Sequence, residues 1–228
     1  MKDLILILMA IFAITGCGQK AHSNTTKKSE EAIYVLFENG GTVTEEEQED
    51  AKLALLHLFQ QFSSLARRKA TKHIQINLVL SALPNRIAWS GTPQQLVEQT
   101  EYVTSLITFK PTFSDLVMAF DQIETTVNLS SAEKIRLYWI GSTVNVPFQK
   151  TDEPIDVEVP QAIPENLALE RLVPILTTLK IMRVHPDQDS VLQAYLTQIG
   201  VMAKARAHEL DFALWGAAQT KANQAKSM

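Results

Sequence analysis

The sequence lacks a second cysteine, an excess of basic residues, and an apolar run long enough to cross a bilayer. Cys17 is the only cysteine among 228 residues, so no disulfide bond can form within the chain. The formal net charge is −4, and the longest basic run is Arg67-Arg68-Lys69. A chain without a strong positive field has little to attract a phosphate backbone, so we expect no nucleic-acid partner.

The composition is typical of a folded soluble domain. Hydrophobic residues make up 46% of the chain and charged residues 20%, with a mean hydropathy of −0.02. Disordered chains and membrane-embedded proteins have different fractions. A single core usually serves roughly 100 to 200 residues, so the length predicts one domain.

An apolar run, Leu4 to Ile14, begins three residues after Met1. It is shorter than the roughly 20 residues of a transmembrane helix and fits the core of a signal peptide. The residues that follow, Ile14-Thr15-Gly16-Cys17, resemble a lipobox, the motif of bacterial lipoprotein precursors. This resemblance implies a signal peptide over 1–16 and lipid on Cys17. An ordinary secretory leader with a chance cysteine is the alternative, but lipidation explains why a lone thiol would be exported.

The residues after the cysteine suggest where the protein is held. Gly18 is not the aspartate that retains enterobacterial lipoproteins at the inner membrane, so the resemblance implies the outer membrane, facing the periplasm. Residues 18–31 contain no apolar side chain larger than alanine, and such a segment cannot bury enough surface to become ordered. We therefore expect 17–31 to be a flexible tether in the cell envelope, joined to the membrane through lipid on Cys17.

Along the rest of the chain, segments with the apolar spacing of a strand alternate with segments that have the apolar spacing of a helix. They predict one domain over 32–222, with a frayed tail over 223–228. Strands are expected at 32–37, 73–80, 86–89, 135–140 and 179–184. Helices are expected at 44–66, 92–108, 114–127, 165–175 and 187–219, the last broken near Gly200. The segment 146–164, with four prolines, is expected to be a surface loop or an edge hairpin. This alternation predicts an α/β fold with three layers, doubly wound around a mainly parallel sheet.

Two strand ends carry the most informative turns. The first strand ends at Glu38-Asn39-Gly40-Gly41-Thr42, and the fourth ends at Gly141-Ser142. With the order of the elements, these turns resemble a von Willebrand factor A domain over roughly residues 32–200. The resemblance implies a cation site at the carboxyl ends of the strands, built from an Asp-x-Ser-x-Ser turn, a later threonine and a final aspartate.

This chain departs from that cation-binding pattern. Glu38 replaces the aspartate of the turn, Gly40 replaces its first serine, and Gly141 occupies the position of the final aspartate. A hard cation needs several oxygen ligands, so these replacements predict that no metal and no other cofactor is bound. The same strand ends remain a possible partner-binding rim, whose residues are Glu38, Asn39, Thr42, Thr112, Ser114, Ser142 and His185.

No catalytic motif is present, since phosphate-loop, dinucleotide, Gly-x-Ser-x-Gly and His-Glu-x-x-His patterns are all missing from the sequence. His185 with Asp187 and Asp189 follows the last predicted strand, where ligands often bind, but helix capping explains both aspartates. We therefore expect a non-enzymatic binding or scaffold subunit of an envelope assembly, such as a secretion or conjugation machine, with other envelope proteins as partners. The alternatives are a metal-dependent adhesion-type receptor domain and a periplasm-facing enzyme with an unrecognised site.

Overall fold

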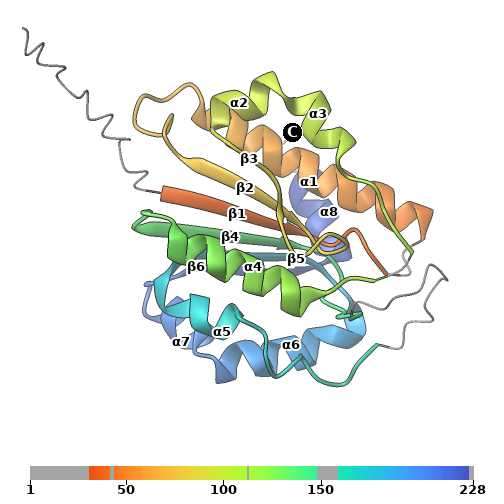
Figure 1. The fold of residues 1–228 in the computed structure, drawn as a ribbon. Helices are drawn as coiled ribbons and strands as arrows, with labels where there is room; N and C mark the ends of the chain where they lie inside the picture. Colours follow the sequence, from red (N-terminus) through yellow and green to blue (C-terminus); the bar gives the residue numbers. More distant parts are fainter. Residues whose placement is uncertain (1–30, 42–43, 112, 148–158, 226–228) are drawn as a thin grey trace, which may run out of the picture.

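The computed structural model describes residues 31–41, 44–111, 113–147 and 159–225. They form one six-stranded sheet in the order β3-β2-β1-β4-β5-β6 (Figure 1). The strands are β1 (Glu31–Phe37), β2 (Gln75–Leu80), β3 (Ile87–Gly91), β4 (Lys134–Ile140), β5 (Leu176–Val184) and β6 (Asp211–Gly216). Neighbours are parallel except for β2 and β3, which pair antiparallel. The expected α/β class is confirmed, and this strand order agrees with a von Willebrand factor A-like arrangement.

Helices cover both faces of the sheet and complete three layers (Figure 1). One face carries α1 (Glu45–Leu65), α2 (Pro93–Glu98), α3 (Thr100–Ser105) and α8 (Ala217–Ala225). The other carries α4 (Leu116–Leu129), α5 (Leu169–Leu172), a 3-10 turn (Val173–Ile175), α6 (Pro186–Gln198) and α7 (Val201–Arg206). Alternate residues of β1 serve the two cores, because successive strand side chains point to opposite faces. Tyr34 and Leu36 join one core, and Val35 and Phe37 the other.

The start of α1 follows from local sequence alone. Thr44 accepts a hydrogen bond from the backbone N–H of Glu47, whose carboxylate accepts one from the Thr44 N–H in return. This capping box satisfies two donors that a helix start leaves unpaired. Leu55, Phe59 and Phe62 recur at helical spacing and are all buried against the sheet. The predicted helix is confirmed here, with its apolar stripe.

Two predicted helices are shorter than expected. The helix predicted over 92–108 is divided into α2 and α3 at Gln99, which leaves helical geometry and accepts a hydrogen bond from Trp89 Nε1 at 2.9 Å. The helix predicted over 165–175 is reduced to α5 and the 3-10 turn. Pro174 lies in that turn and has no N–H to continue an α-helix, so β5 begins directly after it.

The prediction of a helix over 187–219 was wrong in its second half. The break near Gly200 is confirmed, because this residue has a φ of 85° between α6 and α7. Beyond α7, however, the chain forms β6, which pairs parallel with β5. Leu214 and Trp215, both inside the predicted helix, pack on opposite faces of the sheet. Their backbone hydrogen bonds come from β5, which no local pattern reveals.

The boundaries of the folded region also differ slightly from expectation. Glu31, assigned to the tether, already belongs to β1, and α8 continues past the expected end at 222 to Ala225. The signal peptide, Cys17, most of the tether and residues 148–158 of the expected loop lie outside the described residues. None of the helices within the described ranges is both long and apolar enough to span a membrane.

Candidate binding rim at the carboxyl ends of the strands

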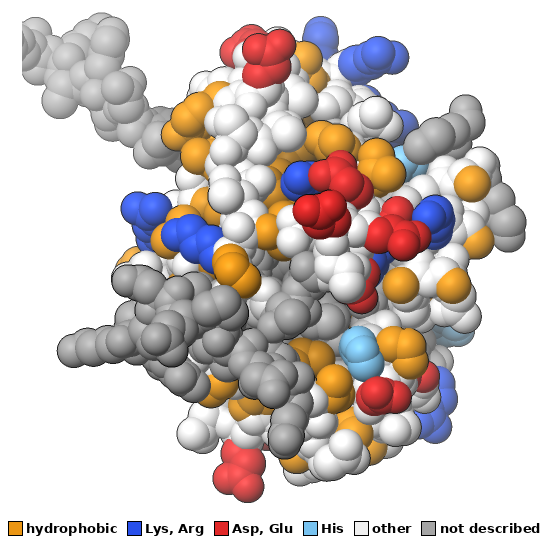
Figure 2. Space-filling view, turned by 90° about the vertical axis from the view of Figure 1, so that its right-hand side faces the viewer, with side chains coloured by type: hydrophobic (Ala, Val, Ile, Leu, Met, Phe, Trp, Pro, Cys, Tyr) orange, Lys and Arg blue, Asp and Glu red, His pale blue; other side chains and the backbone are white. Residues whose placement is uncertain are grey.

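A cavity of about 330 Å³ opens where β1 and β4 lie side by side and their connections leave in opposite directions. Its lining comes from the turns that follow β1 and β4, from the end of β5 and the turn after it, and from α1 and α8, and it includes Glu38, Ser142, Arg183 and His185. Open α/β sheets usually bind their ligands at such a point. The side of the molecule that the strands' carboxyl ends face shows acidic, basic and histidine side chains intermixed (Figure 2). This face therefore has no field of a single sign.

Glu38 is the central group of this rim, although its side chain turns inward. Only 5% of the residue is exposed. Its carboxylate accepts hydrogen bonds from Trp139 Nε1, from Ser142 Oγ at 3.0 Å and from the Thr143 N–H at 3.0 and 3.2 Å. Burial raises the pKa of Glu38 to about 7, and it outweighs these donors, which act to lower the pKa.

The turn after β4 is shaped around that carboxyl group. Thr143 is buried with a φ of 65°, a conformation that typically costs a β-branched residue about 1 to 3 kcal/mol. A Cβ atom at Gly141 would lie 2.3 Å from Cδ of Glu38. The space next to Gly141, where the resemblance places a final aspartate, is therefore filled by the Glu38 side chain.

Asn39 and Ser114 belong to a second cluster, which joins three loops through Ser81. The Asn39 N–H donates to Ser81 Oγ at 3.1 Å, and Ser114 Oγ donates to the same oxygen at 2.8 Å. The Asn39 amide also accepts from the Ala82 N–H at 3.0 Å and donates to the Thr108 carbonyl at 2.8 Å. Both rim residues thus hold neighbouring loops together.

These contacts do not fit a bound cation. Among the described residues, no group of three His, Cys, Asp or Glu side chains could hold a metal ion. Gly40 cannot be replaced by the serine of the family pattern, because a Cβ atom there would lie 1.6 Å from the Phe113 carbonyl oxygen. Thr42 and Thr112 lie outside the described residues.

His185 is the N-cap residue of α6, and its Nδ1 lies 3.8 Å from Asp187 Oδ2. Its Nδ1 accepts a hydrogen bond from the Asp187 N–H at 3.2 Å, and Pro186 occupies the first helical position. His185 itself is therefore the capping residue, whereas the sequence analysis assigned the capping of this helix to the aspartates. Asp187 and Asp189 lie in the first turn, at the positive end of the helix dipole. The His185 N–H also donates to the Ser142 carbonyl at 3.0 Å, which joins the β5 turn to the β4 turn.

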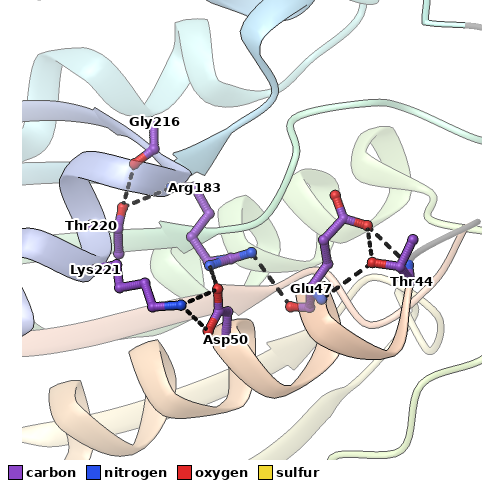
Figure 3. Close-up of polar contacts among 7 residues, drawn as sticks. All are labelled: Thr44, Glu47, Asp50, Arg183, Gly216, Thr220 and Lys221. Atoms are coloured by element: carbon purple, nitrogen blue, oxygen red, sulfur yellow. Dashed lines mark hydrogen bonds and ion pairs between the residues drawn. The ribbon is translucent and has the colours of Figure 1, made fainter.

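Arg183 is the main group that sequence reasoning missed. It has a φ of 71°, and only 8% of its side chain is exposed. Its guanidinium lies between the Glu47 carbonyl, which Nη2 reaches at 3.4 Å, and the Asp50 carboxylate, 3.8 Å from Nη1 (Figure 3). Lys221 approaches the same carboxylate at 3.4 Å, so Asp50 of α1 joins β5 to α8. Burial lowers the pKa of Arg183.

The rim thus combines three predicted residues, Glu38, Ser142 and His185, around one cavity, with Asn39 and Ser114 in the adjoining cluster. Ser81, Thr143 and Arg183 escaped prediction. Ser81 directly follows β2, Thr143 lies in the turn after β4 and Arg183 is the second-last residue of β5, and these positions could have marked them. The molecule is a three-layer α/β protein with a strand-end rim of internally bonded polar groups. No protein-family model matches the chain, and no curated protein matches its sequence.

Proposed function

We propose that this chain is a lipid-anchored protein of the bacterial cell envelope that binds another envelope protein through its strand-end rim and catalyses no reaction. The rim is the set Glu38, Asn39, Ser114, Ser142 and His185, together with the cavity that Glu38, Ser142 and His185 line. Lipid on Cys17 would hold the domain at the outer membrane, and 17–30 would let it reach its partner. A secretion or conjugation assembly is the kind of machine that such a subunit would serve.

One observation carries the proposal: the polar groups of the rim are hydrogen-bonded inside the protein, to one another or to neighbouring loops. The Glu38 carboxylate has three donors, and Asn39 and Ser114 share Ser81. A nucleophile or general base needs a lone pair or proton that faces the substrate. Groups bonded in this way instead keep the surrounding loops in one arrangement. A surface ordered in advance loses little conformational entropy when a protein docks on it.

Site-specific photo-crosslinking in intact cells tests the docking surface. The photoreactive residue replaces Ala217, which is exposed and lines the rim cavity. The control replaces Glu133, which is exposed and precedes β4 at the opposite end of the strands. We expect one adduct of defined mass from position 217 and none from 133. Equal adducts at both positions, or none at 217, would overturn the rim as a docking surface.

Calorimetry with magnesium, manganese and calcium separates this proposal from a metal-dependent receptor. We expect no binding heat, because Gly40 and Gly141 supply no ligand and the Glu38 carboxylate is already bonded. Saturable heat with any of the three ions, lost in Glu38→Gln, would support the receptor function instead.

The anchor is tested separately. Cys17→Ser should move the protein from the membrane fraction to the soluble fraction, because no acyl chains can then be attached. If the variant stays in the membrane fraction like the original chain, the proposal of a lipid anchor on Cys17 is refuted, whatever the crosslinking shows.

A further inference from the structure

A second cavity, of about 300 Å³, lies between α1 and α8 and uses the sheet as its floor. Three adjacent strands supply that floor, through Tyr138 of β4, Met182 of β5 and Trp215 of β6. Met182 and Trp215 are register partners, so their side chains lie next to each other on one face. We call this cavity the Trp215 groove. It shares no lining residue with the rim cavity.

The floor of the Trp215 groove is apolar, aromatic and partly open. Met182 is 7% exposed, while Tyr138 and Trp215 are half-buried. The Tyr138 ring is held by an edge-on contact with Phe62 of α1, with ring centroids 5.1 Å apart. Trp215 differs in this respect from the other two tryptophans of the chain, Trp89 and Trp139, which are 6% and 0% exposed. The groove therefore offers a flat aromatic surface to a ligand.

The walls of the groove are polar but carry almost no net charge. Gln61 and His57 of α1 line one side, where their side chains bond to each other at 2.9 Å, and Asn223 and Gln224 of α8 also line the cavity. An amide side chain can both donate and accept hydrogen bonds. Lys180 is the one Lys, Arg, Asp or Glu in the lining, and it forms an ion pair with Asp211. An ionic ligand would find no unpaired opposite charge here.

These features together define the chemistry of a ligand. A purely apolar chain would remove water from these polar walls and offer no hydrogen bond in exchange, which is unfavourable. A ring with apolar C–H faces and a hydroxyl edge would satisfy both surfaces, since its faces pack on Trp215 and Tyr138 while its hydroxyls meet the amides. The volume is at the lower end of small-molecule sites, which begin at roughly 300 Å³.

We propose that the Trp215 groove binds a neutral saccharide of one or two sugar rings. Trp215 and Tyr138 form the stacking floor, and Gln61 and Asn223 are the hydrogen-bonding walls. This site is independent of the strand-end rim, so either proposal can fail without the other.

Tryptophan fluorescence of the purified full-length protein, in a detergent without a sugar headgroup, tests the proposal. The probes are cellobiose, N,N′-diacetylchitobiose and maltose. We expect a saturable change in emission with at least one disaccharide, because Trp215 is the tryptophan open to added ligand. Saturation transfer from protein protons to sugar protons in NMR gives a second readout that does not depend on tryptophan.

Three variants locate the binding. Trp215→Ala should weaken affinity by about tenfold or more, and Asn223→Ala, an exposed change on α8, by roughly three- to tenfold. Tyr102→Ala removes an aromatic ring that is 56% exposed on α3, outside the groove, and should leave affinity unchanged. Circular dichroism checks that each variant remains folded.

The proposal is overturned by any of three results. No saturation with any of the three disaccharides in either readout removes the site. Binding that persists undiminished in both Trp215→Ala and Asn223→Ala places the sugar elsewhere on the protein. Equal weakening by Tyr102→Ala would show that the loss at the groove is not specific to it.

Discussion

The strand-end rim and the Trp215 groove lie on the same sheet but differ in how their polar groups are used. At the rim, buried groups such as Glu38 and Asn39 are bonded to neighbouring loops, and glycines allow the backbone to pack closely. In the groove, aromatic rings are half-exposed and amides line open space. The rim is consequently a rigid part of the core that reaches the surface, whereas the groove exposes aromatic and amide groups that a ligand can cover. Substitutions should therefore cost stability at the rim and ligand affinity at the groove.

The largest effect is expected from Gly40→Ala. Its new Cβ atom would meet a backbone carbonyl, that of Phe113, which cannot turn away as a side chain could. We expect a loss of about 3 kcal/mol or more in the free energy of unfolding, measured by denaturant titration. Gly200→Ala is the control, because its positive φ of 85° costs about 1 kcal/mol while its Cβ would meet nothing within 4 Å. Similar losses in the two variants would contradict the tight packing of the rim.

Next in size is the pH dependence caused by Glu38. Burial raises the pKa of this carboxyl from 4.5 to about 7, so between these values the folded state holds a proton that the unfolded chain has lost. The free energy of unfolding should therefore be highest below about pH 4.5 and fall as the pH rises to about 7, by on the order of 3 kcal/mol for this group.

Glu38→Gln tests this assignment, because its amide stays neutral at every pH. The variant should lose most of the decline in stability between pH 5 and 7, in the same denaturant titration at several pH values. Glu101→Gln, an exposed carboxylate-to-amide change on α3, should keep the decline. A Glu38→Gln variant with the full original decline would assign the titration to another group.

Trp139 at the rim and Trp215 in the groove provide a smaller and more direct comparison of stability at the two sites. Trp139→Phe removes the Nε1–H that the buried Glu38 carboxylate accepts and leaves a gap beside Phe120, so we expect a loss of about 2 kcal/mol. Trp215→Phe, in the half-exposed groove floor, should cost less than about 1 kcal/mol. The difference between their thermal unfolding midpoints measures the contrast, and an inverted order would refute it.

The smallest effects are expected at the link between α1, β5 and α8. Asp50→Asn removes the carboxylate beside the buried Arg183 guanidinium and should cost about 1 kcal/mol, since the pair is long at 3.8 Å. Lys221→Met should cost less than about 0.5 kcal/mol, because the Lys221 side chain is 64% exposed. High salt should reduce the Lys221 effect more than the Asp50 effect. Equal costs for the two variants would mean that Arg183 does not depend on Asp50.

Much of the fold could be predicted because its signals are local. The apolar run of β1, the capping box at Thr44 and the left-handed break at Gly200 each depend on residues within a few positions of one another. The alternation of such elements predicted the α/β class. The positions of Glu38, Ser142 and His185 after predicted strands likewise placed them together, since parallel strands bring their carboxyl ends to one edge of the sheet.

The sequence by itself therefore determined which segments become most strands and helices, and which turns meet at the rim. Only the tertiary structure decided that 211–216 is a strand, because its backbone hydrogen bonds come from β5. It also decided that Glu38 turns inward to Trp139, a residue 101 positions away along the chain. The Trp215 groove depends on both kinds of contact, since its floor exists only where β6 has joined the sheet and α8 packs beside α1. Such pairings are chosen by the burial of distant surfaces, and no short stretch of sequence encodes them.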